Sequence, residues 1–223
     1  DFCLNRVLIW FPTYEEATKQ GVHVVPGKKK VSLEKYRTDP AANALDTPSG
    51  KIEIFSEKLL QFTAGWELTD GDTLPGMTTL PPIPVHIPEW FGTETTTKEY
   101  PLALCGFHYR GRIHSSWGSI PELKEVNPQE AWINPEDAQT RNIAEGDTVR
   151  VKNQFGQIEL LAKVTPRVVP GVVAVSQGAW HEADMKGDRI DKGGCLNTLT
   201  TLRPSPLAKG NPQHTNICQV VKA

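Results

Sequence analysis

The chain has 223 residues, which is enough for one complete domain and a smaller second part. Hydrophobic residues make up 38% and charged residues 22%, a composition typical of a folded globular protein rather than a disordered one. Lys and Arg number 24 against 26 acidic residues, and the resulting net charge of -2 argues against a nucleic-acid-binding surface, which needs an excess of cations. No apolar run approaches the roughly 20 residues that a membrane-spanning helix requires.

The first 46 residues are predicted to be the tail of a preceding domain. The sequence opens at Asp1 without an initiator Met and runs at once into an apolar stretch, so we expect an excised fragment of a longer polypeptide. A short helix is predicted over 13–20, because Pro12 precedes it and Gly21 ends it.

Residues 47–98 are predicted to connect that tail to a second domain. The apolar alternation of residues 51–56 predicts a strand, and Ser56 is a candidate cap for a short helix over 57–62. From Thr69 to Lys98 the prolines are spaced too closely for a regular helix or a central strand. We expect this stretch to lie extended, as an arm between domains.

Residues 99–223 are predicted to form the main domain. One helix is expected over 136–142, with Asn134 as its cap and Pro135 at its first position. Strands are expected over 101–105, 148–152, 157–164, 172–175 and 215–221, with a hairpin turn at 153–156. Short strands around one helix favour a small closed barrel over a doubly wound sheet.

The four cysteines do not suggest a metal site. Cys3, Cys105, Cys195 and Cys218 form no Cys-x-x-Cys pair, and each has apolar or strand-like neighbours. We expect buried thiols rather than ligands of zinc or of an iron–sulfur cluster.

The segment most suggestive of ligand binding is 105–118. A buried strand ends there, and the chain at once offers glycines, arginines, histidines, serines and aromatic residues. Glycines permit close approach of the backbone, arginines suit phosphate oxygens, and aromatic rings can flank a heterocycle. Taken alone, the segment fits a phosphate-bearing, ring-containing ligand and a surface loop equally well.

A second polar cluster lies near the end of the chain, at 193–201 and 209–215. Its amides and hydroxyls could read the donor and acceptor edge of a pterin or guanine, although a long loop rich in turn-forming residues is the alternative. Between the two clusters, residues 177–181 follow a strand end. Trp180 in this stretch is expected to be a core residue rather than a ligand contact.

These motifs together resemble the C-terminal dinucleotide-binding domain of the dimethyl sulfoxide reductase family of molybdenum enzymes. The likeness runs in order through segments 47–53, 101–118, 132–138, 145–151, 170–173, 191–197 and 203–212. The last two are most similar to the catalytic chains of the anaerobic, membrane-associated members. Arg203-Pro204-Ser205 and Lys209-Gly210 depart from the pattern of many members, which have Asp-Pro and Ser-Gly there.

The resemblance implies a mainly β fold with a few helices: a double-psi β-barrel of the aspartate-decarboxylase-like type over 99–223, preceded by a partial α/β segment. It also implies a cofactor, molybdopterin guanine dinucleotide, carried in two copies on one molybdenum. Arg112, His114 and Ser115 would meet phosphate oxygens, and Asn197 would hold a pterin edge. The cofactor-binding positions carried over from the family are Gly106, Phe107, His108, Arg112, His114, Ser115, Ser116, Asn134, Asp137, Asn197, Gln213 and His214.

By the same resemblance, the intact protein would be an S-oxide or N-oxide reductase. Its redox ligands lie upstream of the matched residues in this family, so we expect no catalytic residue and no metal ligand here, and we expect the isolated fragment to be inactive and to lack cofactor. The implied partners are the remaining domains of the catalytic chain, an iron–sulfur electron-transfer subunit and a membrane-anchor subunit, on the periplasmic face of the inner membrane.

Two alternatives stay open at this point. A stand-alone double-psi barrel could recognise another protein through segment 107–117, in which case the aromatic rather than the basic side chains would dominate binding. A hydrolase built on His114 and Ser115 is the weaker alternative, because adjacent residues rarely form a productive pair and no orienting carboxylate is evident.

Overall fold

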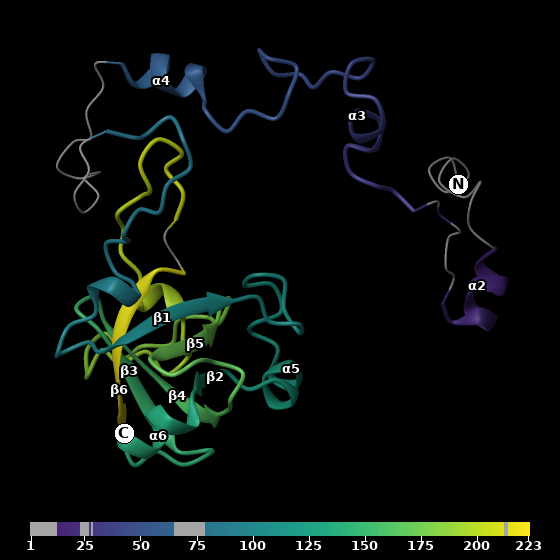
Figure 1. Ribbon diagram of the computed structural model, residues 1–223. Helices are drawn as coiled ribbons and strands as arrows, with labels where there is room; N and C mark the ends of the chain where they lie inside the picture. Colours follow the sequence, from purple (N-terminus) through teal and green to yellow (C-terminus); the bar gives the residue numbers. More distant parts are fainter. Residues whose placement is uncertain (1–12, 23–26, 28, 65–78, 212–213) are drawn as a thin grey trace. The chain divides into compact units, whose positions relative to one another are not determined.

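The computed structural model describes residues 13–22, 27, 29–64, 79–211 and 214–223. Its contacts divide the chain into two units, residues 1–54 and residues 55–223. Among the described residues, every strand belongs to the second unit (Figure 1).

The first unit contains two short helices. α2 (Tyr14–Gln20) confirms the helix expected over 13–20, and a capping box fixes its start. The Thr13 hydroxyl accepts the Glu16 N–H at 3.3 Å, and the Glu16 carboxylate accepts the Thr13 N–H at 2.8 Å. Gly21 ends the helix with a φ of +70°. α3 (Glu34–Thr38) adds a helix that the sequence pattern did not predict.

The strand expected over 51–56 is wrong. Those residues form bends, and the side chains of Ile52 and Ile54 are 65% and 73% exposed. An apolar alternation makes a strand only where a second strand satisfies the backbone and another layer covers the apolar face. In the described part of the chain no strand pairs with this segment.

The stretch before the barrel is otherwise as expected. α4 (Glu57–Thr63) confirms the predicted helix, and the Ser56 hydroxyl accepts the Leu59 N–H at 3.1 Å. Residues 79–98 of the proline-rich arm contain one 3-10 helix, η2 (Thr93–Thr95), and neither an α-helix nor a strand. None of the helices described is both long enough and apolar enough to cross a bilayer.

Six strands close into a barrel, which confirms the architecture predicted from their lengths (Figure 1). β1 runs parallel to β5 and β2 runs parallel to β4, while the other neighbours are antiparallel. The ring order is β1-β5-β2-β4-β3-β6. The strands are β1 (Leu102–Phe107), β2 (Glu130–Ile133), β3 (Thr148–Lys152), β4 (Gln157–Val164), β5 (Val172–Ser176) and β6 (Asn216–Lys222).

Inward-facing apolar side chains fill the barrel. In β4 the alternate residues Ile158, Leu160 and Ala162 are buried, whereas Leu161 between them is 42% exposed. Residues from all six strands share this core, including Leu102, Leu104, Ile133, Val149, Val151, Val173, Val175 and Val220. The 3-10 helix η3 (Leu196–Leu199) adds two further leucines to it.

Two α-helices lie between strands of the barrel, α5 (Pro121–Val126) and α6 (Pro135–Thr140). Asn134 caps α6 as predicted, because its side chain accepts the Glu136 N–H at 2.9 Å. The helix ends two residues before the predicted end at residue 142, and α5 was not predicted.

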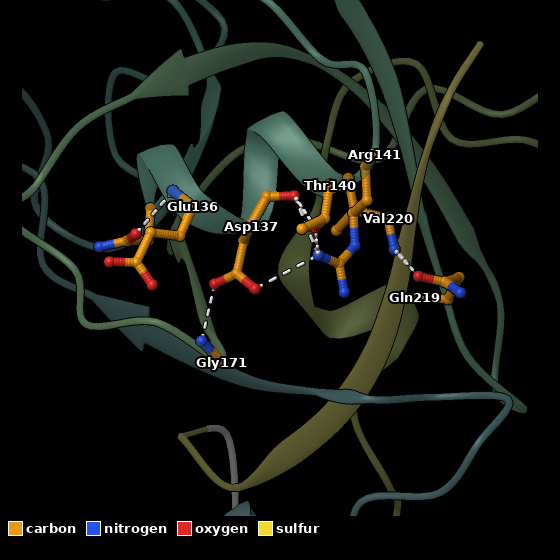
Figure 2. A network of polar contacts seen from close by, with 8 residues as sticks. Glu136, Asp137, Thr140, Arg141, Gly171, Gln219 and Val220 are labelled. Atoms are coloured by element: carbon orange, nitrogen blue, oxygen red, sulfur yellow. Dashed lines mark hydrogen bonds and ion pairs between the residues drawn. The ribbon is translucent and has the colours of Figure 1, made fainter.

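Asp137 fastens α6 to the start of β5 (Figure 2). Its carboxylate accepts the Gly171 N–H at 2.6 Å and lies 3.2 Å from the Arg141 guanidinium. β2 runs antiparallel to β5, with Ile133 opposite Val173. The helix that follows β2 therefore lies at the end of the barrel where β5 begins.

Candidate functional site

Three segments that are distant in the sequence line one groove at the end of the barrel where β1 and β5 finish. We call it the rim groove, and its volume is about 510 Å³. One side comes from the loop after β1, one from the loop after β5, and one from the segment around η3. The lining residues are His114, Ser115, Gln177, Gly178, Ala179, Trp180, His181, Cys195, Leu196, Asn197 and Asn211. His114 and Asn197, predicted to meet, thus lie in the same groove.

The parallel pairing of β1 and β5 explains why two of these loops meet. Phe107 at the end of β1 lies beside Ser176 at the end of β5, so both chains leave the barrel at the same edge. β1 extends two residues beyond the predicted end at Cys105, because Gly106 and Phe107 continue its pairing with β5. These two predicted site residues therefore belong to the strand and not to the loop that follows.

The His114 turn is held against the loop after β5 by direct backbone contact. His114 has a φ of +50°, a left-handed conformation that is strained for a side chain other than glycine. Its carbonyl packs on Gly178, where an added Cβ would lie 1.8 Å from the His114 oxygen. The Trp180 indole N–H donates to the Ser115 carbonyl at 2.9 Å. Both contacts fix the direction in which His114 and Ser115 face the groove.

The segment that contains η3 and His214 lies at the same edge of the barrel, because it packs on Gly106. A Cβ at Gly106 would lie 2.6 Å from Leu196 and 3.1 Å from the His214 ring, so only glycine permits this approach. The His214 Nδ1 donates to the Gly106 carbonyl at 2.8 Å. Leu196 and Leu199 are buried in the barrel core, which leaves the intervening Asn197 exposed on the groove.

Arg112 lies beside the rim groove, in a second groove of about 340 Å³ that shares Ala179 and Trp180 with it. Its guanidinium donates to the Gln129 and Ser176 side chains, the latter at 2.6 Å. Partial burial lowers the pKa of Arg112 from its ordinary value, although the group stays cationic at neutral pH. Its Nε–H is buried and has no hydrogen-bond partner within the described residues.

Gln177 joins two predicted histidines. Its side-chain nitrogen lies 2.8 Å from His108 Nδ1 and 3.4 Å from His114 Nδ1. The two rings stand edge to face with their centroids 5.2 Å apart. The same nitrogen also lies 3.1 Å from His108 Nε2, and which ring nitrogen accepts the amide N–H depends on the tautomer of the ring. The contact with His114 involves Nδ1, so its Nε2 lies outside this contact.

The prediction that the thiols are buried is confirmed for one of the three described cysteines and is wrong for the other two. Cys218 is fully buried, whereas Cys105 and Cys195 are half-buried, and Cys195 lines the rim groove. Cys3 lies outside the described residues. Burial raises the pKa of Cys195, and it raises the pKa of Cys218 much further. No group of three or more His, Cys, Asp or Glu side chains among the described residues could hold a metal ion.

These pKa shifts predict how fast the thiols alkylate. A raised pKa leaves less of the reactive thiolate at a given pH, so native Cys195 is expected to react with iodoacetamide more slowly than free cysteine between pH 7 and 9. Its rate should rise with pH, while Cys218 stays unmodified until the barrel unfolds. Peptide mapping by mass spectrometry would measure both rates, and equal native labelling of the two cysteines would contradict this description.

Several predicted site residues lie away from the rim groove. Phe107 packs its ring on Trp132 at a centroid distance of 4.8 Å, and Ser116 lies outside the lining set. Asn134 and Asp137 stand at the other end of β5, where the Asn134 amide also donates to the Val168 carbonyl at 2.8 Å. Gln213 lies outside the described residues. Among the positions carried over, His114, Ser115 and Asn197 line the groove itself.

Other lining residues were not among the predicted site positions. Gln177, Trp180, His181 and Asn211 all line the groove. The expectation that Trp180 is a core residue is wrong, since 52% of it is exposed. The available signal was its position just after a strand end, where ligand-binding loops gather.

The groups around the two grooves suit a dinucleotide with heterocyclic and phosphate parts. Amides of Gln177, Asn197 and Asn211 provide both donors and acceptors, as the edge of a pterin or guanine requires. The second groove is lined by the cations Arg112, Lys124 and Lys192, which match phosphate oxygens, and also by Glu159 and Glu182. Lys124 is paired with Glu182 at 2.6 Å.

Comparison with known proteins identifies the family of the barrel domain. The model of the molydopterin dinucleotide binding domain matches residues 102–217. The chain is 51% identical to a putative dimethyl sulfoxide reductase chain of Escherichia coli over 95% of this chain and 26% of that protein. It is 50% identical to dimethyl sulfoxide reductase DmsA of the same organism, over 95% of this chain and 25% of that protein. A trimethylamine-N-oxide reductase of Haemophilus influenzae is 37% identical over 87% of this chain and 23% of its own length.

Among solved structures, acetylene hydratase from Pelobacter acetylenicus has the same fold. The TM-score is 0.59 at 18% identity, over 94% of this chain and 28% of that one. The chain thus spans about a quarter of the length of the relatives it matches. By its sequence, its barrel and the family model that covers it, the chain belongs to the molybdopterin dinucleotide-binding domains of the dimethyl sulfoxide reductase family.

Proposed function

We propose that this chain is the cofactor-binding part of the catalytic polypeptide of a molybdenum oxidoreductase. The observation that carries the proposal is the rim groove, where loops more than 80 residues apart in the sequence present His114, Ser115 and Asn197 to one space. When bound with molybdenum, molybdopterin guanine dinucleotide supplies two-electron and oxygen-atom transfer. The named relatives reduce dimethyl sulfoxide or trimethylamine N-oxide, so we propose an S-oxide or N-oxide as the substrate of the complete protein.

In this function the chain's own residues bind and orient the cofactor. His114 donates from the ring nitrogen that faces away from Gln177, and the Ser115 hydroxyl donates beside it. Arg112 attracts phosphate oxygens from the second groove, and its position is fixed by Gln129 and Ser176. Asn197 and Asn211 meet the polar edge of a ring with complementary donors and acceptors.

We further propose that the barrel is a double-psi barrel that completes a larger α/β domain. The interleaved ring order and the two parallel pairs, β1 with β5 and β2 with β4, support this. An iron–sulfur subunit, a membrane-anchor subunit and a place on the periplasmic face of the inner membrane are also proposed. These rest on the resemblance to membrane-associated dimethyl sulfoxide reductases.

The proposal predicts that Arg112→Ala and Asn197→Ala lower the cofactor content of the complete polypeptide. A hydrogen bond to a charged group contributes about 1.5–3 kcal/mol, which corresponds to roughly 10-fold to 100-fold in affinity. The measurements are molybdenum by elemental analysis and guanine nucleotide released on denaturation, each per mole of protein. Arg110→Ala is the matched control, because Arg110 is exposed in the same loop and lines neither groove.

Two results would decide against this assignment. Full cofactor content with normal turnover in both variants would reject these residues as contacts, and the absence of guanine nucleotide from the unaltered complete polypeptide would reject the function. The 223-residue chain alone is expected to hold no stoichiometric cofactor, because about half of the enclosure that such a ligand needs is missing.

A further inference from the structure

The carboxylate of Asp191 is fully buried, and no salt bridge joins it to a cation within the described residues. Four hydrogen bonds take the place of a counter-ion. Oδ1 accepts the N–H groups of Glu182 at 2.8 Å and Gly193 at 2.9 Å. Oδ2 accepts the Cys195 N–H at 2.7 Å and the Thr198 hydroxyl at 3.1 Å. A buried charge is tolerated only when its oxygens are satisfied in this way.

The backbone of Asp191 is fixed to the barrel. Its N–H donates to the Gln157 carbonyl at 3.0 Å, and its carbonyl accepts the Glu159 N–H at 2.9 Å. Both partners belong to β4, whose Ile158 lies between them in the barrel core. Asp191 thus forms an isolated bridge to β4, and its carboxylate projects from a backbone that the barrel holds in place.

The groups that Asp191 holds adjoin two sides of the rim groove. Glu182 directly follows Trp180 and His181, whereas Cys195 and Thr198 flank Leu196 and Asn197. The two segments touch through their backbones, since a Cβ at Gly193 would lie 2.0 Å from the Trp180 carbonyl. One carboxylate thus sets the spacing between Trp180 and Asn197 across the groove.

We propose that Asp191 is the positioning residue of the rim groove, holding the Trp180 and Asn197 segments at the separation that the cofactor needs. The inference rests on the proposed function for its consequence, but its structural part concerns this chain alone. Asp191 touches neither the groove nor reacting atoms and so is not a catalytic residue. It acts through the segments it ties.

Asp191→Asn tests this role with little change in size. An amide places an N–H₂ group against one pair of donors, so at least one side of the junction loses its acceptor. We expect backbone amides of residues 180–198 to exchange hydrogen about 10-fold to 100-fold faster, while the barrel strands exchange at the unaltered rate. In the complete polypeptide we expect guanine nucleotide content to fall by a similar factor. The matched control is Asp184→Asn, because Asp184 is exposed in the same stretch and its carboxylate accepts the local amides of Lys186 and Gly187.

Thr198 supplies a pair of variants that separates positioning from packing. Its hydroxyl binds Asp191, and its methyl group packs against Gly156. Thr198→Val keeps the shape and loses the hydroxyl, whereas Thr198→Ser keeps the hydroxyl and loses the methyl. Positioning by Asp191 predicts faster exchange and lower cofactor content in the valine variant and near-normal behaviour in the serine variant. The two Thr198 variants also test the positioning role if Asp191→Asn does not fold.

The outcomes distinguish this inference from the proposed function. Unchanged exchange in Asp191→Asn, or a defect in the serine variant without one in the valine variant, would overturn the positioning role. If Asp191→Asn accelerates exchange but the unaltered complete polypeptide holds no guanine nucleotide, the positioning role stands and the proposed function fails. If the nucleotide is present and both Asp191→Asn and Thr198→Val retain it fully, the proposed function stands and the role assigned to Asp191 fails.

Discussion

Gly178→Ala is expected to destabilise the barrel domain and to empty the rim groove of its ligand. Gly178 has a φ of +93°, which costs an L-residue about 1–2 kcal/mol. Its Cβ would also lie 1.8 Å from the His114 carbonyl oxygen, and relieving such overpacking costs about 1–3 kcal/mol more. The His114 turn must move away, so we expect cofactor content in the complete polypeptide to fall with stability. Urea unfolding and guanine nucleotide release would measure the two effects.

Gly171→Ala is the matched control at the other end of β5. Gly171 has a similar φ of +82°, but nothing lies within 4 Å of its added Cβ. It should show the cost of the left-handed backbone without the collision, and its cofactor content should be normal. Equal losses of stability and of cofactor in the two variants would show that the contact between Gly178 and His114 is not what orders the turn.

Ile158→Ala is expected to lower the free energy of unfolding by about 2–5 kcal/mol, because it opens a cavity in the barrel core. Ile158 is fully buried on β4, pairs with Val151 of β3, and lies between the two residues that bind the backbone of Asp191. The midpoint of urea unfolding should therefore fall, and cooperative unfolding allows the change to be read as a free energy.

Leu161→Ala on the same strand provides the comparison. Leu161 is 42% exposed and points away from the core, so its truncation should change stability far less. A loss in Leu161→Ala as large as that in Ile158→Ala would mean that the inward and outward faces of β4 have been assigned wrongly.

Strands with a clear two-residue period were predictable from the sequence. β3 and β4 begin and end at the predicted residues because their alternation is regular and a turn at 153–156 separates them. β2 was missed because Glu130–Ile133 is too short to show a period, and its pairing with β4 and β5 is what makes it a strand. The strand predicted over 51–56 is the opposite case. That segment has a clear two-residue period, but in the described part of the chain no neighbouring strand pairs with it.

The site was predictable as far as residue chemistry allowed. His114, Ser115 and Asn197 stood out because polar and basic groups gathered after strand ends, and the structure brings them to one groove. Trp180 was misjudged, since a tryptophan after a buried strand resembles a core residue until the contact with Ser115 is known. Asp191 was not among the predicted site positions, although it begins the family-like segment 191–197. Its importance comes from four bonds that exist only after the chain has folded.

The two ends of β5 have separate structural roles, and this separation has a consequence for the evolution of such a barrel. Asp137 and Arg141 brace the frame at the edge where β5 starts, and the groove opens at the edge where it finishes. Substitutions at the groove edge can alter which ligand fits while the brace at the far edge is left intact. One scaffold could therefore diversify its cofactor and substrate preferences without first losing its stability.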